Sequence, residues 1–321
     1  MINTVANTAF SVYNGLQTSF TLHNFHHFSG TASYTWSRAI DNVSEIFSTA
    51  GGGTTNAFGQ DPLNTDVGER GVSGNSYPNV WGIQTVYNEP WFSHQSGILG
   101  RLLGGYFFNT FYQYNGGQPF SPFQAVASSN PFLPNPGDAM ATTSFCDTNF
   151  DLQFDFGGFV NQCRPILANK SAPVSSVGIN VGGGNYMNYA TGVYGSRSSF
   201  HWLWNNQYEA LALKNPFPGV GRNTLRGDSF NNLDLTVGKN IKIRERVNML
   251  LEVSAFNAFN RAYYGTPDPN IEDSLYPAEG LPASFLLNTF ENGNAGSAAG
   301  GGAFFQGAGN RNIQLIGKIT F

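Results

Sequence analysis

The sequence has little charge, few cysteines and no long apolar run, and each shortage excludes a class of protein. Charged residues make up 11% of the 321 residues, against about 25% in an average soluble domain. No run of about 18 apolar residues is present, which excludes a helical membrane span. The net charge of -4 and the lack of basic clusters argue against nucleic acid. The absence of a nucleophile-and-base motif predicts that the chain is not an enzyme.

Glycine and aromatic residues are abundant instead, with 39 Gly, 28 Phe and 14 Tyr. In the last segment, 309–321, Ile313, Leu315, Ile319 and Phe321 share one parity, whereas the other parity is mainly polar. Such a strand has one face suited to lipid and one suited to water. Because it also ends on an aromatic residue, it is typical of the last strand of a membrane β-barrel.

Six further segments show the same alternation and are separated by connections of very unequal length. Together with the last segment they predict strands over 12–23, 28–38, 80–88, 105–114, 230–239, 247–255 and 309–321. The connections run short, long, intermediate, very long, short and long: 24–27, 41–78, 89–103, 115–228, 240–246 and 257–308. A soluble sandwich has no reason to sort its loops in this way, whereas a transmembrane barrel has short periplasmic turns and long extracellular loops.

The predicted fold is therefore all-β, an antiparallel transmembrane β-barrel portion in the outer membrane of a Gram-negative-type bacterium. Seven strands are visible, or nine if the aromatic stretch 198–213 and a partner also cross the membrane. Region 115–228 is the predicted long extracellular loop region. An open sheet edge leaves backbone groups without hydrogen bonds in lipid, so we expect the strands to be part of a larger closed barrel.

The only cysteines, Cys146 and Cys163, both lie in the long loop region. Two cysteines within one loop of an oxidising compartment predict a disulfide, which would restrict the loop. The alternative is a two-thiolate metal site, but no His lies nearby to complete it.

Between the cysteines, Asp147, Asn149 and Asp151 place oxygen atoms at alternating positions. Calcium uses clusters of this kind. The segment lacks the glycine and the closing Glu of a calcium loop, so a solvated acidic loop is the simpler interpretation. We therefore predict no cofactor, with calcium as the alternative.

An aromatic group, Trp202, Trp204 and Tyr208, lies in the same loop region. Such rings can stack on a sugar or another planar ligand, which makes these residues a candidate ligand-binding site. The alternatives are an aromatic girdle at the membrane interface or the core of a folded loop.

Six short motifs resemble the C-terminal barrel half of TonB-dependent outer-membrane receptors, and in particular the Oar-like group, whose members carry a carboxypeptidase-regulatory-like domain. They occupy 13–17, 32–42, 116–120, 221–227, 230–235 and 255–261, and read YNGLQ, ASYTWSRAIDN, GGQPF, GRNTLRG, FNNLDL and AFNAFNR. Such receptors close a roughly 22-stranded barrel around an N-terminal plug and take up scarce ligands.

The resemblance implies that residues 1–321 are the C-terminal part of an outer-membrane barrel whose loops recognise a ligand for uptake. The partners it implies are membrane lipid, the barrel-assembly machinery and the TonB system, which would act through a plug domain absent from this chain. Residues 1–7 do not form a secretion signal. We therefore expect a signal, a plug and further strands to be encoded upstream.

A structural or adhesive surface protein that assembles through its strands is the main alternative function. Low charge and abundant glycine and aromatic residues also suit close self-packing. A passive porin is a third interpretation. Release by salt or chelator without detergent would favour the adhesive protein, whereas a requirement for detergent would favour the barrel.

The C-terminal residue, Phe321, is the predicted signal for barrel assembly. It lies on the lipid-facing parity, and the proteins that the chain resembles present an aromatic C-terminal residue to the assembly machinery. Deleting Phe321 should sharply lower the folded, membrane-inserted fraction, measured as the heat-modifiable band on a gel. Unchanged insertion would contradict this role.

Overall fold

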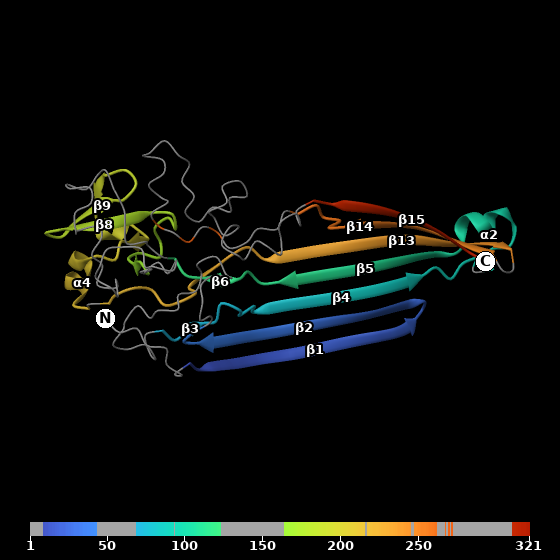
Figure 1. Cartoon of the computed structure of the whole chain (residues 1–321), viewed down its shortest axis with the longest axis horizontal. Helices are drawn as coiled ribbons and strands as arrows, with labels where there is room; N and C mark the ends of the chain where they lie inside the picture. Colours follow the sequence, from blue (N-terminus) through green and yellow to red (C-terminus); the bar gives the residue numbers. More distant parts are fainter. Residues whose placement is uncertain are drawn as a thin grey trace, which may run out of the picture.

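Seven long antiparallel strands form the main sheet (Figure 1). The computed structural model describes residues 9–43, 69–92, 94–122, 164–215, 217–244, 247–261, 267, 269, 271 and 310–321. The strand order is β1-β2-β4-β5-β13-β14-β15, and the short β3 pairs with β2. The strands are β1 (Ser11–Phe25), β2 (Phe28–Asp41), β3 (Gly71–Val72), β4 (Asn79–Asn88), β5 (Tyr106–Asn115), β13 (Phe230–Arg244), β14 (Val247–Phe256) and β15 (Asn312–Thr320).

All seven predicted strands are present, which confirms the all-β antiparallel prediction. The predicted short turn between β13 and β14 is present, but its bounds, 240–246, are too wide, because β13 continues to Arg244 and pairs Lys242 with Asn248 of β14. Ile241 and Ile243 continue the apolar parity of the strand, and pairing with β14 outweighs the polar and charged residues that suggested a turn. Stretch 198–213 lies outside the main sheet, so the nine-strand alternative is wrong for this segment. It contains β11 (Trp202–Leu203), α4 (Gln207–Leu213) and part of the helical turn η1 (Arg197–Ser199).

Cross-strand pairing places one parity of every long strand on a common face. At one edge Phe20 lies opposite Ala32, and at the other Val253 lies opposite Leu315. We call this the apolar face; its large residues include Leu16, Phe20, Trp36, Trp81, Phe108, Val237, Leu251, Val253, Ile313, Leu315 and Ile319. The opposite side, the polar face, carries mainly hydroxyl and amide groups, as on Gln17, Ser19, Thr21, Thr31, Ser33, Thr35, Gln84, Asn109, Gln113, Thr236, Ser254 and Gln314.

The apolar face is open in the described part of the chain. Phe20, Ile313 and Leu315 are 67%, 60% and 75% exposed. The buried hydrophobic core of the described residues contains no residue from the seven long strands. So much apolar surface would be unfavourable in water, and this face therefore suits lipid.

The connections are sorted between the two ends of the sheet (Figure 1). One end, which we call the turn end, carries the β1–β2 and β13–β14 turns, the β4–β5 connection with helix α2 (Gly97–Leu103), and the C-terminus. The other, the loop end, carries the three long connections. The β1–β2 turn consists of His26 and His27, both at positive φ (49° and 66°), as a type I′ turn requires. The predicted sorting of loop lengths is confirmed.

A second folded unit lies within the very long β5–β13 connection, and we call it the loop module (described residues 164–215 and 217–229). Its five strands run in the order β10-β9-β8-β11-β7, and α4 contacts β8. The further strands are β7 (Ile166–Leu167), β8 (Val177–Gly182), β9 (Asn185–Asn188) and β10 (Tyr194–Gly195). A separate pair joins β12 (Leu225–Arg226) to β6 (Pro119–Phe120). Among the helices of the described residues, none is long and apolar enough to cross a membrane.

Gly238 on the polar face leaves room for the ring of Phe107, its partner on β5. A Cβ atom at 238 would lie 1.9 Å from Phe107 Cζ, so the ring would have to move. Gly238→Ala should therefore destabilise the sheet by about 1–3 kcal/mol, measured by thermal loss of the folded band. The same change in a Phe107→Ala background should cost much less. Equal costs in the two backgrounds would show that the ring does not occupy this space.

Candidate functional site

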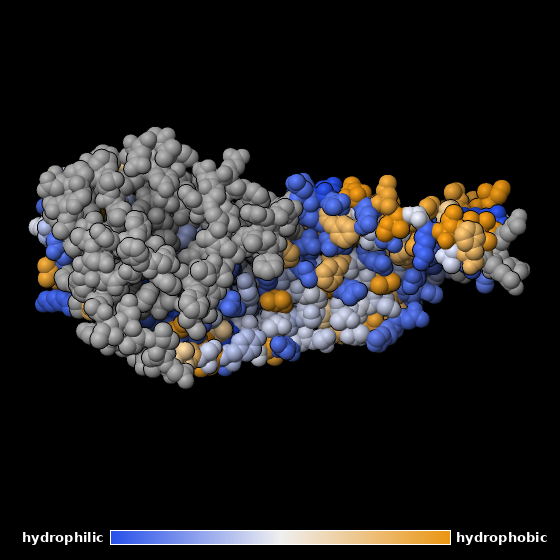
Figure 2. All heavy atoms as spheres, viewed as in Figure 1, coloured by the Kyte–Doolittle hydropathy of each residue, from blue (hydrophilic) through white to orange (hydrophobic). Residues whose placement is uncertain are grey.

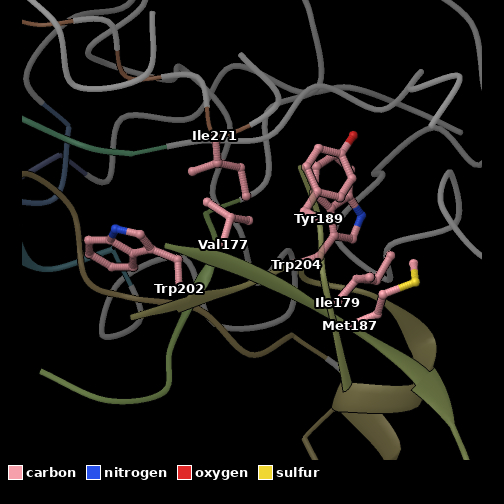
Figure 3. Packing of buried hydrophobic residues seen from close by; sticks show 7 residues of the cluster. All are labelled: Val177, Ile179, Met187, Tyr189, Trp202, Trp204 and Ile271. Carbon is pink, nitrogen blue, oxygen red and sulfur yellow. The ribbon is translucent and has the colours of Figure 1, made fainter. Parts of the chain in front are cut away.

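The interior of the loop module is a closed aromatic core (Figure 3). Its buried residues are Val177, Ile179, Met187, Tyr189, Trp202, Trp204 and Ile271. Tyr189 and Trp204 stack with their ring centroids 4.6 Å apart and 19° between the ring planes, a geometry that adds to the free energy of apolar burial. Ile271 comes from the β14–β15 connection and is 0% exposed. Two of the long connections therefore share one core.

A buried carboxylate organises the polar side of the module. Glu209 of α4 is 0% exposed and accepts three side-chain hydrogen bonds, from Asn180 at 2.9 Å, Tyr186 at 3.1 Å and Arg197 at 2.9 Å. Burial and the neighbouring Glu209 carboxylate raise the pKa of Tyr186 above its ordinary value. Because these bonds join α4 to β8, β9 and η1, the helix and the sheet are held in one arrangement.

Two buried arginines tie the loop module to the rim of the main sheet. Arg164 donates two hydrogen bonds, of 2.8 and 2.7 Å, to the Glu69 carboxylate, and both side chains are 6% exposed. Arg222 forms an ion pair with Asp41 at the end of β2, and these side chains are 6% and 5% exposed. Charges this far from water are stable only when they are paired and hydrogen-bonded. The module is thus fixed to the sheet by charge-assisted hydrogen bonds.

Further hydrogen bonds extend this junction to neighbouring loops. Asn223 Nδ2 donates to the carbonyl of Val72 in β3. The Arg226 guanidinium donates to the Ser76 carbonyl at 3.0 Å. Burial, together with the charge of Arg38, lowers the pKa of Arg226. The described segment 69–78 of the β2–β4 connection is therefore held on both sides of β3.

Three of the six motifs meet at this junction. Arg222, in motif 221–227, pairs with Asp41 of the second motif. Gly117, in the third motif, lies so close to Gly227 that a Cβ atom would be 1.7 Å from its carbonyl oxygen. Only glycine fits at such an approach. Segments that are far apart in the sequence thus form one structural joint between the sheet and its longest loop.

The structure encloses the aromatic group that sequence analysis proposed as a ligand site. Trp202 and Trp204 are 2% and 0% exposed, so neither ring presents a free face in this structure. Trp202 Nε1 also donates to the carbonyl of Val174 at 2.8 Å. Tyr208 is half-buried on α4. The packing is that of the loop-core alternative, and ligand binding by these residues stays a prediction.

The predicted disulfide and calcium positions, Cys146, Cys163, Asp147, Asn149 and Asp151, lie outside the described residues. Both interpretations therefore stay predictions. Over the ranges that the structure describes, no group of three or more His, Cys, Asp or Glu side chains is placed to hold a metal ion.

The described strands combine one apolar face, one polar face and loops sorted to one end. A family model for the outer membrane beta barrel domain matches residues 1–314. The chain belongs to this family. No curated protein and no solved structure matches the chain. As an outer membrane beta barrel domain, the chain resides in the outer membrane, and the apolar face of its sheet is the surface that meets lipid.

Sequence analysis did not single out Glu69, Arg164 or Glu209, which are central to the loop module and its attachment. The feature of the sequence that could have identified them is the scarcity of charged residues, which make up only 11% of the chain. Arg164 and Glu209 lie beside apolar or aromatic residues, where a charge is buried only when it is paired. Glu69, in contrast, lies between Gly68 and Arg70 and shows no such signal. Their partners are not visible in the sequence, because Arg164 and Glu69 are 95 residues apart.

Replacing Arg164 tests how firmly the module is attached. Arg164→Ala removes both hydrogen bonds to a carboxylate that is 6% exposed, and such losses cost about 3–5 kcal/mol. We expect faster proteolytic cleavage within the loop module of the folded, membrane-embedded protein. The double variant Arg164→Ala/Glu69→Ala should recover part of the loss. Lys170→Ala, an exposed cation of the same module, should cleave like the wild type; equal rates for all variants would refute the tether.

Proposed function

We propose that the chain is the barrel part of a TonB-dependent receptor of the Oar-like group, and that the loop module recognises the ligand for uptake. The observation that carries this proposal is the folded module tied to the rim at the loop end by buried ion pairs. The six motifs support the receptor group. The orientation that fits the proposal places the loop end outside the cell and the turn end in the periplasm.

The module has the properties of a recognition surface. Binding residues are found mainly on loops that a rigid scaffold positions, and the aromatic core and the Glu209 network form such a scaffold. Val193, Tyr194 and Leu211 project from it and are 64%, 68% and 69% exposed. Exposed apolar and aromatic side chains on a fixed framework supply contact area with little loss of entropy.

The polar face of the sheet supports passage of a hydrophilic solute. Its side chains are mainly hydroxyl and amide groups, including Ser19, Thr31, Ser33, Gln84 and Thr236. Such groups exchange hydrogen bonds with water and with polar solutes without holding either tightly. The face that would line the barrel is therefore compatible with release of a ligand after recognition.

The proposed partners follow from this assignment. Lipid surrounds the apolar face, the barrel-assembly machinery binds the C-terminal strand at Phe321, and the TonB system supplies energy through a plug domain. We propose no catalytic activity, no cofactor and no nucleic-acid partner. Calcium remains the alternative for Asp147, Asn149 and Asp151.

Uptake by the bacterium that carries the gene tests the proposal. The depletion of solutes from a complex medium is compared between the wild type and a gene deletion, with and without an uncoupler of the proton-motive force. We expect at least one solute to be depleted only when the protein is present and the membrane is energised. Depletion that resists the uncoupler would indicate a passive porin. Unchanged depletion with loss of cell adhesion would indicate the structural alternative.

A pair of variants tests the role of the module in that uptake. Tyr194→Ala removes an exposed ring from the module and should raise the solute concentration needed for half-maximal uptake. Phe20→Ala removes an aromatic ring of similar exposure, 67%, from the lipid-facing apolar face of β1, and should leave uptake unchanged. The same effect from both variants would place recognition elsewhere.

A further inference from the structure

Helix α2 presents its apolar side chains away from the rest of the protein. Its four large apolar residues, Ile98, Leu99, Leu102 and Leu103, are 87%, 66%, 62% and 48% exposed. The opposite side is glycine: Gly100 is buried, and a Cβ atom there would lie 3.0 Å from the backbone of Gln95. A helix surrounded by water buries its apolar side and exposes its polar side. Helix α2 instead exposes its large apolar side chains.

Specific hydrogen bonds hold α2 in this position. Gln95 is 6% exposed; its Nε2 donates to the Asn240 carbonyl at 2.6 Å, and its Oε1 accepts from Lys242 N at 2.9 Å. The amide side chain thereby satisfies backbone groups of β13 where that strand extends beyond β5. Glu89 accepts a hydrogen bond at 3.1 Å from the backbone N–H of Gly105, which follows the last turn of the helix. The exposure of the leucines is therefore built into the fold.

The contacts of its last turn place α2 at the margin of the apolar face. The carbonyl of Leu102 accepts hydrogen bonds from Tyr106 Oη and Lys239 Nζ. Tyr106 and Lys239 are cross-strand partners, two residues from Phe108 and Val237 respectively, so they share the apolar face with them. Lys239 Nζ also lies 4.0 Å from the centroid of the Tyr106 ring. The exposed surface of α2 thus continues the surface that meets lipid.

We propose that α2, together with Trp91 and Phe92, is an anchor that lies in the phospholipid leaflet at the turn end of the barrel. Trp91 and Phe92 precede the helix and are 66% and 51% exposed, and Figure 2 shows apolar side chains gathered at this end of the molecule. The ring of Trp91, which is apolar apart from one N–H group, favours the boundary between acyl chains and headgroups, and the apolar ring of Phe92 favours the acyl chains. Arg101, the basic residue of the last turn, and Lys239 supply the cations that phosphate groups attract.

Site-specific photo-cross-linking in the native outer membrane tests the anchor. A benzophenone amino acid replaces either Ile98 or, as the matched control, Leu211, each an exposed apolar residue of a seven-residue helix, at 87% and 69%. We expect irradiation to yield phospholipid adducts from position 98 and none from position 211. Folding of each variant is checked by its heat-modifiable band.

The other outcomes are equally informative. Adducts between position 98 and a protein would assign α2 to a periplasmic partner and overturn the proposal. Adducts to lipopolysaccharide would place the turn end in the outer leaflet, and a yield no higher than that of position 211 would place α2 in water; each result would also overturn it. Leu99, 66% exposed on the same helix, is the second cross-linking position if the change at 98 prevents folding.

Discussion

The register of the main sheet is the constraint on which the rest of the structure depends. Because side chains alternate with a period of two, a slip of one residue would move the apolar set of a strand to the opposite face. Pairs such as Phe20–Ala32 and Val253–Leu315 keep one parity apolar across the sheet. The described long strands contribute nothing to the buried hydrophobic core. Backbone pairing between strands and contact with lipid therefore stabilise them.

The loop module follows the opposite rule, because its surroundings are aqueous in the proposed orientation. It buries its own aromatic core around Trp204 and Tyr189, as a small soluble domain does. The junction of the two units lies at the rim of the main sheet. Paired charges occupy that place, with Arg164 on Glu69 and Arg222 on Asp41. Buried ion pairs add little net stability. A different position of the module would leave these charges buried without partners, so the pairs specify where the module lies on the sheet.

The strands were predictable from the sequence because parity is a local property that each segment shows by itself. The extension of β13 shows the same parity, because Ile241 and Ile243 continue the apolar face. The polar or charged residues that alternate with them also suit a turn, and pairing with β14 decides between the two. The roles of Trp202 and Trp204 could not be decided from the sequence. Aromatic residues at this spacing suit a girdle, a ligand site or a core, and the choice depends on partners such as Ile271, which are distant in the sequence.

The same argument explains what sequence can say about α2. Its sequence, GILGRLL, shows that the helix has an apolar side but not where that side points. The surrounding medium, water or lipid, determines whether that side is buried or exposed. Aromatic residues on the apolar face mark where the lipid layer ends. Tyr106 lies at one end of β5; at the other, Tyr114 lies opposite Trp81, whose ring is 4.2 Å from that of Tyr34. Segment 106–114 lies between these two groups of aromatic residues. Its length is close to that of a tilted strand that crosses a bilayer, about 9–11 residues. Because α2 contacts Tyr106 itself, it lies where the apolar layer ends, and a helix at that depth is stable with its leucines directed outward.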